Sequence, residues 1–218
     1  MEAVLERRRP LRGCRLLDVG AGSGLIAEHF VDLVGSEGQV SALDTTNQLK
    51  TDRVDFHEVS GTAIPFEADT FDIVISNHVI EHVGEAKDQV HHLEEAVRVL
   101  KADGLLYLAM PNRWAVMEPH FRLAFLSWLP RKLRTPWVRA FQGRGKIYDC
   151  EPLSRREALA LLGTCNFQAE DITREVLGLM ADLEFAGPAR WLVPFVARYA
   201  WFACRPFIPT LVFLCKPV

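Results

Sequence analysis

Long apolar runs are scarce in this sequence of 218 residues. The most apolar stretch covers residues 191–215, but two arginines and three prolines interrupt it, and its longest charge-free run is the ten residues 206–215. A membrane-spanning helix needs about 20 apolar residues. The first ten residues, MEAVLERRRP, have no apolar run behind their charges, so we expect no secretory signal. We therefore expect a soluble chain that, at most, lies on a membrane surface.

Cysteine is also sparse, and its spacing shows no motif. The five cysteines form no Cys-x-x-Cys pair, which argues against a zinc ribbon or a disulfide framework and favours a reducing, cytoplasmic location. Apolar residues nevertheless make up 49% of the chain and charged residues 24%, which excludes a disordered protein. We expect one globular domain over residues 1–218. The cysteines are Cys14, Cys150, Cys165, Cys204 and Cys215.

The net charge of −3 conceals two unlike halves. Residues 1–110 carry 10 basic and 19 acidic side chains, whereas residues 111–218 carry 15 basic and 9 acidic ones. An acidic half and a basic half suggest two roles within one domain. This balance does not favour nucleic acid as the partner of the whole chain.

Strand-like and helix-like patterns alternate through the first half. Such alternation predicts parallel strands joined by crossover helices, which is a doubly wound α/β fold. The expected strands are 14–20, 39–44, 53–59, 71–76 and 105–110, and the expected helices are 25–34 and 87–101, the second ended by Asp103-Gly104.

The alternation stops after residue 110. Residues 111–150 mix proline, tryptophan and arginine irregularly, and we interpret them as an inserted helical cap after the fifth strand. Ser154 and Glu157 have the spacing of a capping box that opens a helix through residue 162. Strands are expected at 167–175 and 210–216, with an apolar helical segment at 176–208 between them.

A glycine-rich turn, LLDVGAGSG at residues 16–24, follows the first strand. Glycines let the backbone bend and approach a ligand closely, and the next helix presents its N-terminus to that ligand. The dinucleotide fingerprint requires a glycine at position 25, where this chain has Leu25, so a pyrophosphate is not favoured. Asp44 ends the second strand, twenty residues after Gly24, where a carboxylate can accept hydrogen bonds from both ribose hydroxyls.

At these positions the sequence resembles the class I S-adenosylmethionine-dependent methyltransferases, in particular the ubiquinone/menaquinone-type branch. The resemblance rests on LLDVGAGSG at 16–24, ALD at 42–44, GTAIPFEADTFDIVISNHVIEHV at 61–83 and EAVRVLKADGLLYLAMPN at 95–112. It implies a seven-stranded, mostly parallel sheet with an antiparallel last strand. It also implies S-adenosylmethionine as cofactor, lying across the first four strands.

The resemblance assigns cofactor contacts residue by residue. The glycine turn would hold the methionine part, Asp18 would brace the turn, Asp44 would bind the ribose, residues 60–63 would flank the adenine, and Asn77 and His78 would line the wall near the sulfonium. Ser60 stands where relatives often have aspartate, which weakens the expected adenine contact. The full set is Asp18, Gly20, Ala21, Gly22, Ser23, Gly24, Asp44, Thr45, Ser60, Gly61, Thr62, Ala63, Asn77 and His78.

Methyl transfer from a sulfonium is an in-line displacement, so the protein supplies mainly alignment and water exclusion. A protonated acceptor such as a hydroxyl also needs a base. We expect His78, His120 or Tyr148 to take this part, with His82 as a further candidate.

His78, Glu81 and His82 form an H-x-x-E-H pattern. A zinc site of that type must lie on a helix, whereas this segment follows a strand. Some related O-methyltransferases have Glu-x-x-Glu-His here and bind magnesium. We instead expect no metal, with Glu81 and His82 hydrogen-bonded locally. His91 and His92, on the helix at 87–101, are expected to be solvated.

The inserted cap is basic and aromatic. We interpret it as the roof of the acceptor pocket, where its aromatic rings suit a flat or lipophilic acceptor and its cations suit an anionic substrate or membrane surface. A helical hairpin with a solvated basic face is the alternative. The apolar segment at 176–208 is expected to pack on the sheet or against a second subunit, with peripheral membrane contact as a further possibility.

We therefore expect a methyltransferase acting on a small lipophilic or aromatic acceptor, most often at oxygen. A non-catalytic S-adenosylmethionine-binding protein and an RNA methyltransferase are the alternatives. The segment Ser-Asn-His-Val at 76–79 stands where base-amine methyltransferases often have Asn-Pro-Pro-Tyr, which disfavours the RNA alternative.

Overall fold

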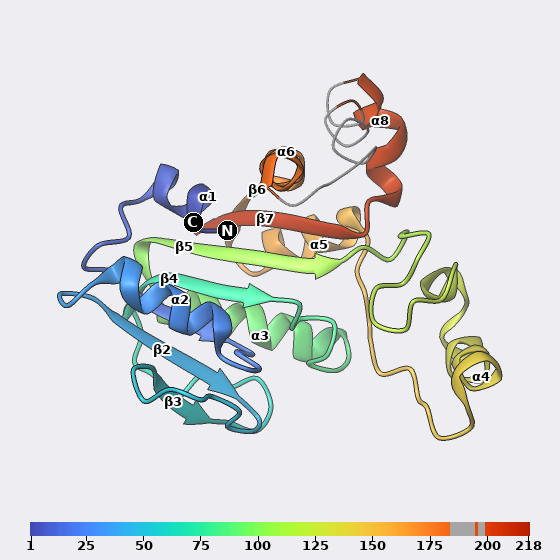
Figure 1. The fold of residues 1–218 in the computed structure, drawn as a ribbon, viewed down its shortest axis with the longest axis horizontal. Helices are drawn as coiled ribbons and strands as arrows, with labels where there is room; N and C mark the ends of the chain where they lie inside the picture. The colour runs from blue at the N-terminus through green and yellow to red at the C-terminus, as the bar shows by residue number, and fades with distance from the viewer. Residues whose placement is uncertain (184–194, 196–198) are drawn as a thin grey trace.

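The computed structural model of this protein, which describes residues 1–183, 195 and 199–218, contains one seven-stranded sheet (Figure 1). The order across the sheet is β3-β2-β1-β4-β5-β7-β6. β7 runs antiparallel to both of its neighbours and the other pairs are parallel, which confirms the expected doubly wound fold. The strands are β1 (Arg15–Val19), β2 (Gln39–Asp44), β3 (Asp55–Glu58), β4 (Phe71–Asn77), β5 (Leu100–Pro111), β6 (Phe167–Asp171) and β7 (Thr210–Pro217).

Helices cover both faces of the sheet, because the central strands are apolar on both sides. In β4, Val74 faces one core cluster and Ile75 faces the other. The first cluster lies under α3 (Ala86–Val99) and α5 (Arg155–Thr164). The second lies under α1 (Glu2–Arg8), α2 (Leu25–Val34) and α6 (Thr173–Leu183).

Local signals explain several helix boundaries. Glu85 and Asp88 form a capping box at the start of α3, and the predicted box of Ser154 and Glu157 opens α5. α2 begins at Leu25, directly after Gly24, whose φ of 78° places it in the left-handed region. The sheet order brings the carboxyl ends of β1, β2 and β4 to one edge, where the glycine turn lies.

Several predicted boundaries were wrong, among them the start of the fifth strand at residue 105, since β5 begins at Leu100. α3 ends at Val99 rather than at residue 101, because Leu100 already pairs with Phe71 in β5, and a register shift separates this pair from that of Leu105 with Ile73. β6 ends at Asp171 rather than at residue 175, because the Asp171 carboxylate accepts a hydrogen bond from the Thr173 amide at 3.1 Å and α6 begins there.

The expected cap at residues 111–150 lies beyond the carboxyl end of β5 (Figure 1). It contains the short helix η1 (Leu126–Trp128) and the helix α4 (Arg131–Gln142), joined by irregular segments. Buried Arg134 donates hydrogen bonds to the carbonyls of Leu129 and Ser127, which ties α4 to η1. The cap is therefore less helical than expected but has a fixed interior.

The predicted helical segment at 176–208 falls partly outside the described residues. α6 ends at Leu183, and α8 (Trp201–Cys204) and η3 (Arg205–Phe207) precede β7. The Asn112 side chain donates hydrogen bonds to the carbonyls of Pro206 and Ile208, so η3 is joined to the start of the cap. None of the helices within the described part of the chain is long and apolar enough to cross a membrane.

Candidate functional site

The glycine turn folds tightly at the end of β1. Gly20, Gly22 and Gly24 have φ values of 71°, 54° and 78°, a conformation that other residues rarely adopt. A Cβ atom on Gly20 would stand 2.4 Å from Cγ2 of Val79, and one on Gly24 would stand 2.6 Å from Cγ of Leu49. These two positions therefore require glycine for space as well as for backbone conformation.

Asp18 lies buried just before the turn, with 1% of its surface exposed. Burial raises its pKa to about 7; a hydrogen bond from the Ala27 backbone lowers the pKa, and the negative charge of Asp44 adds to the rise. Its Oδ2 atom has no hydrogen-bond partner among the described residues. The bond to α2 agrees with the expected bracing role, because Ala27 lies in the helix that the turn opens.

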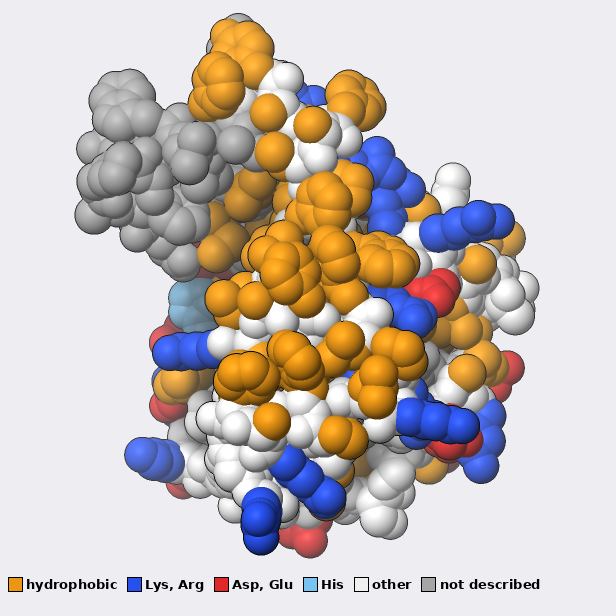
Figure 2. Space-filling model, turned by 90° about the vertical axis from the view of Figure 1, so that its right-hand side faces the viewer, with side chains coloured by type: hydrophobic (Ala, Val, Ile, Leu, Met, Phe, Trp, Pro, Cys, Tyr) orange, Lys and Arg blue, Asp and Glu red, His pale blue; other side chains and the backbone are white. Residues whose placement is uncertain are grey.

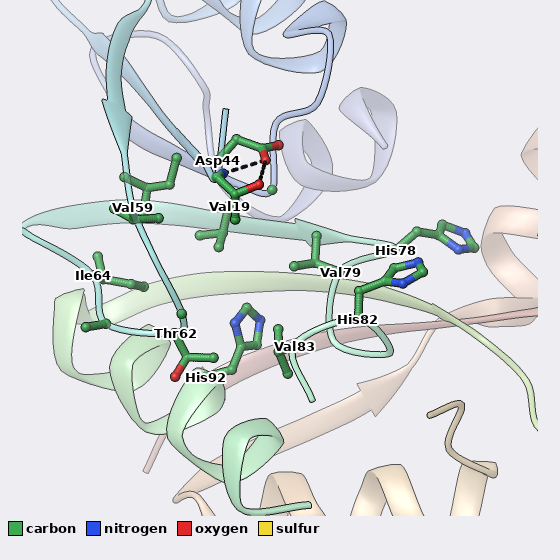
Figure 3. A pocket seen from close by; sticks show the side chains of 15 residues that line it. Val19, Asp44, Val59, Thr62, Ile64, His78, Val79, His82, Val83 and His92 are labelled. Carbon is green, nitrogen blue, oxygen red and sulfur yellow. Dashed lines mark hydrogen bonds between the residues drawn. The ribbon is translucent and has the colours of Figure 1, made fainter. Parts of the chain in front are cut away.

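Asp44 holds the turn directly (Figure 3). Its Oδ2 accepts a hydrogen bond from the Gly22 amide at 2.7 Å, and its Oδ1 accepts bonds from the Thr45 amide at 2.6 Å and the Thr45 hydroxyl at 3.2 Å. A carboxylate has about four acceptor positions. Three of these positions are occupied here. If the Thr45 hydroxyl rotated away, two acceptor positions of Asp44 would be free, which is the number that two ribose hydroxyls need.

A cavity of about 440 Å³ opens beside this turn (Figure 3). Seven of the predicted cofactor residues line it, namely Gly20, Asp44, Thr45, Gly61, Thr62, Ala63 and His78. The cavity lining does not include the other seven, which are Asp18, Ala21, Gly22, Ser23, Gly24, Ser60 and Asn77. Its apolar wall comes from the described residues Val19, Leu43, Val59, Ile64, Val79 and Val83.

His92 also lines the cavity, contrary to the expected solvation. It is 2% exposed, and its Nε2 lies 3.0 Å from Oγ of buried Ser76. Burial lowers its pKa to about 4, so the ring is neutral at neutral pH. The missed signal is its spacing, since His92 shares one helical face with buried Gln89 and Ala96. His91 is exposed as expected.

Three histidines meet at one end of the cavity. His78, whose φ of 59° is unusual for a residue other than glycine, and His82 both line the cavity. His120 approaches from the cap, and its Nε2 lies 3.2 Å from Nε2 of His82. The structure therefore brings His78 and His120, both predicted as bases, into one cluster with His82.

Two buried carboxylates accompany these rings. Glu118 is 2% exposed, and its Oε1 lies 3.0 Å from Nδ1 of His120, which raises the pKa of His120. Glu81 is 1% exposed, and its Oε1 lies 3.4 Å from Nδ1 of His78 and 3.5 Å from Nε2 of His120. The expected local hydrogen bond between Glu81 and His82 is absent, since their closest charged atoms are 3.9 Å apart and neither Glu81 oxygen is hydrogen-bonded within the described chain.

Tyr148, the third predicted base, lies within the cap. Its ring packs 5.4 Å from that of Phe121, and the guanidinium of Arg134 lies 5.6 Å from its centroid. Burial raises the pKa of its hydroxyl, which no other described group hydrogen-bonds. Tyr148 is also absent from the lining of the described cavity, so a catalytic part for it stays a prediction.

Comparison with known proteins agrees with this geometry. Residues 17–108 match the family model described as "Methyltransferase domain". The chain is similar to the ubiquinone biosynthesis O-methyltransferase of Rhizobium rhizogenes, with 32% identity over 133 residues that cover 56% of this chain and 52% of the relative. It thus spans about half the length of the curated relatives it matches.

Two solved structures share the fold. An S-adenosylmethionine-dependent methyltransferase from Mesorhizobium loti has a TM-score of 0.62 and 15% identity, covering 98% of this chain and 96% of that one. The 1,6-didemethyltoxoflavin-N1-methyltransferase from Burkholderia thailandensis, crystallised with S-adenosylhomocysteine, has a TM-score of 0.56 and 16% identity, covering 99% and 76%. At these identities the likeness establishes the fold.

Together these findings show a Rossmann-like methyltransferase fold whose residues 17–108 match a methyltransferase domain, and the sequence resemblance implies S-adenosylmethionine as its cofactor. Within that class, its sequence is similar to the ubiquinone biosynthesis O-methyltransferases in particular. The residues fit the cofactor. At Gly22 no described atom lies within 4 Å of the place of a Cβ, so the turn backbone is open to a ligand, and Asp44 stands beside it.

Proposed function

We propose that this protein transfers a methyl group from S-adenosylmethionine to an oxygen atom of a small lipophilic or aromatic acceptor. The observation that carries the proposal is the position of His78, which lines the cofactor cavity at the end where the cap begins. A hydroxyl acceptor must lose a proton during methylation, and an imidazole at the cavity wall can take it. The similarity to enzymes named as O-methyltransferases agrees with this choice of atom.

The bound cofactor supplies an activated methyl group on a sulfonium, so the chain's own residues have positioning tasks. Asp44 would hold the ribose, the turn at Gly20 would receive the methionine part, and Thr62 and Ala63 would flank the adenine. Apolar Val79 and Val83 keep water from the reacting atoms. The His78 imidazole would orient the acceptor hydroxyl and take its proton.

The first experiment tests cofactor binding. Isothermal titration with S-adenosylmethionine and S-adenosylhomocysteine should give one site per chain. Asp44→Ala should weaken both by about tenfold or more, since it removes a ribose ligand. Asp52→Ala, an exposed acidic residue of the same loop, is the control and should bind normally. Absence of binding at millimolar cofactor would refute the proposal.

A second experiment identifies the acceptor. Phenols, catechols, quinols and lipids would be incubated with methyl-labelled cofactor, and the products separated by mass and chromatography. O-methyl products from aromatic hydroxyls support the proposal. Transfer to RNA, favoured by the basic cap, or cofactor binding with no transfer to any acceptor would support instead the RNA methyltransferase or the non-catalytic binding protein.

The cap surface suggests where a lipophilic acceptor is met. Leu133, Trp137 and Phe141 recur every four residues along α4, and each is at least 41% exposed, whereas Arg134 and Val138 face the interior. Figure 2 shows hydrophobic side chains gathered on this side of the molecule with basic side chains beside them. An exposed apolar helix stripe beside cations is typical of a helix that lies in the interface of an anionic membrane.

The charges of the cap complement such a membrane. Its exposed basic residues outnumber its exposed acidic ones, since Glu118 is buried and Asp149 is the remaining acid. We therefore place the protein at the cytoplasmic surface of an anionic membrane, and free thiols at all five cysteines agree with a reducing location. The alternative is a homodimer in which a second copy of the chain covers this stripe. The exposed cations are Arg122, Arg131, Lys132, Arg139, Arg144 and Lys146.

A further inference from the structure

Three potential metal ligands from distant parts of the sequence meet where the cap contacts the core. His82 lies in the loop after β4, His120 lies in the cap, and Cys150 ends the cap. One ligand atom from each lies within 4.8 Å of the others. Nε2 of His82 is 3.2 Å from Nε2 of His120, and Sγ of Cys150 is 3.8 Å from Nδ1 of His82.

A second observation points to a cation at the same place. Both carboxylate oxygens of Glu81 lack a hydrogen-bond partner in the described chain, although Glu81 is 1% exposed. Oε1 of Glu81 is directed into the cluster, at 3.5 Å from Nε2 of His120 and 3.9 Å from Nε2 of His82. A buried carboxylate without partners is costly, and a coordinated cation satisfies it.

The surroundings also orient one ligand. Oε1 of Glu118 lies 3.0 Å from Nδ1 of His120, and its Oε2 accepts a hydrogen bond from the Phe121 amide at 2.6 Å. When Nδ1–H of His120 donates its hydrogen bond to this carboxylate, Nε2 keeps a free lone pair, which is directed at Glu81 and His82. Metal-binding histidines are commonly held in this way by a carboxylate.

The donor set selects the metal. Two imidazole nitrogens, a thiolate and one carboxylate oxygen suit Zn²⁺, whereas Mg²⁺ prefers oxygen ligands. Tetrahedral Zn²⁺ places its donor atoms roughly 3.3–3.8 Å apart. The separations of 3.2 Å and 3.5 Å at His120 are close to this range, and Sγ of Cys150 lies within 4.8 Å of a ligand atom of His82 and of His120.

From this arrangement we infer that His82, His120, Cys150 and Glu81 bind one Zn²⁺ ion that fastens the cap to the core. The expectation of a metal-free site considered only the H-x-x-E-H segment, without ligands from other parts of the chain. The cap supplies two such ligands, from its interior and from its end. Because His82 also lines the cofactor cavity, the ion would hold the cap beside the acceptor's entry.

Cobalt spectroscopy on the full chain tests the ligands. Chelator-treated protein would be titrated with Co²⁺ and then with Zn²⁺. We expect one equivalent of Co²⁺ with visible bands of tetrahedral coordination and a near-ultraviolet thiolate band, both lost when Zn²⁺ displaces it. Millimolar Mg²⁺ should not compete. Cys150→Ser should abolish the thiolate band and weaken Zn²⁺ binding about tenfold or more.

Two controls keep the result decisive. Cys165→Ser changes another buried thiol, which lies 3.8 Å from the Val90 carbonyl, and should bind Co²⁺ as the wild type does. If Cys150→Ser fails to fold, alkylation of the wild-type protein answers the question, because bound Zn²⁺ should slow labelling of Cys150 alone. Octahedral Co²⁺ without a thiolate band, unchanged binding by Cys150→Ser or unchanged Cys150 labelling would each overturn the site. None of these measurements depends on methyl transfer.

Discussion

The Ser76 hydroxyl lies 3.0 Å from Nε2 of His92, which lines the cavity beside the glycine turn, and both side chains are buried. This contact joins the end of β4 to α3 at the place where the cavity lies. Burial disfavours the protonated form of the His92 imidazole, so acid should destabilise the folded protein at this pair.

The first prediction concerns this pair. The pKa of His92 is lowered by burial to about 4, below its ordinary value, so the unfolded chain binds the extra proton first. The free energy of unfolding should therefore fall as the pH drops from about 6.5 towards 4, by about 2 kcal/mol at pH 5. Urea denaturation at pH 7 and pH 5 measures this.

Matched variants separate His92 from other titrating groups. His92→Gln should lose this component of the pH dependence, while His91→Gln, which changes the exposed neighbour, should keep it. An equal pH dependence in His92→Gln and the wild type would show that His92 is not responsible.

The alternating strands, the glycine turn and Asp44 could be predicted because each depends on local sequence. Burial on both faces makes β4 a continuous apolar run, and the turn needs glycines whatever the rest of the chain does. The pocket wall was harder to predict. His92 is polar, and only the shared helical face with Gln89 and Ala96 indicates that it points inward.

The cluster at the cap could not be predicted, because no local pattern connects its members. His120 lies 38 residues and Cys150 lies 68 residues from His82 along the chain. Their meeting depends on the path of an irregular cap, which hydrophobic periodicity does not describe. The early start of β5 was missed for a related reason, since the pairing of Leu100 with Phe71 overrides the helical pattern.

The second prediction concerns the glycine turn. Gly20→Ala should destabilise the protein and abolish cofactor binding, because its Cβ would stand 2.4 Å from the Val79 side chain at a φ of 71°. Gly22→Ala meets no described atom within 4 Å, so it should be strained but milder in its effect on stability. Val79→Ala should partly rescue the stability of Gly20→Ala. Thermal denaturation and cofactor titration of the four variants check this, and equal losses at both glycines would contradict it.

The third prediction concerns the base. His78→Gln should lower kcat by about 100-fold or more for a hydroxyl acceptor, because it removes the imidazole that would take the proton at the cavity wall. Cofactor affinity should change by less than about threefold. Steady-state kinetics and titration measure the two effects, and His57→Gln, a change on β3 outside the cavity lining, serves as control. If kcat of His78→Gln equals that of the wild type, His78 is not the base: either another group takes the proton or the reaction needs no base.

The fourth prediction concerns Asp72, which joins the N-terminal segment to the sheet. Burial opposes its charge, but a hydrogen bond from the Arg15 amide and the charges of Lys101 and Arg9 give a net lowering of its pKa. Its contribution to stability should be present above its ordinary pKa of 3.8 and be lost as the pH falls below that value. Asp72→Asn should cost about 1–3 kcal/mol at pH 7. Asp103→Asn, which changes an exposed partner of the same Arg9, should cost less than about 1 kcal/mol.

The last prediction tests the apolar stripe on α4. Sedimentation with vesicles containing anionic lipid should capture the wild-type protein and capture much less at high salt, since cations of the cap draw it to the surface. Trp137→Ser with Phe141→Ser should weaken capture about tenfold or more, because both rings are exposed and would lose their place in the interface. Exposed Tyr199→Ser, which lies outside the stripe, is the control. If the double variant instead turns a wild-type dimer into a monomer and leaves capture unchanged, the stripe binds a second copy of the chain.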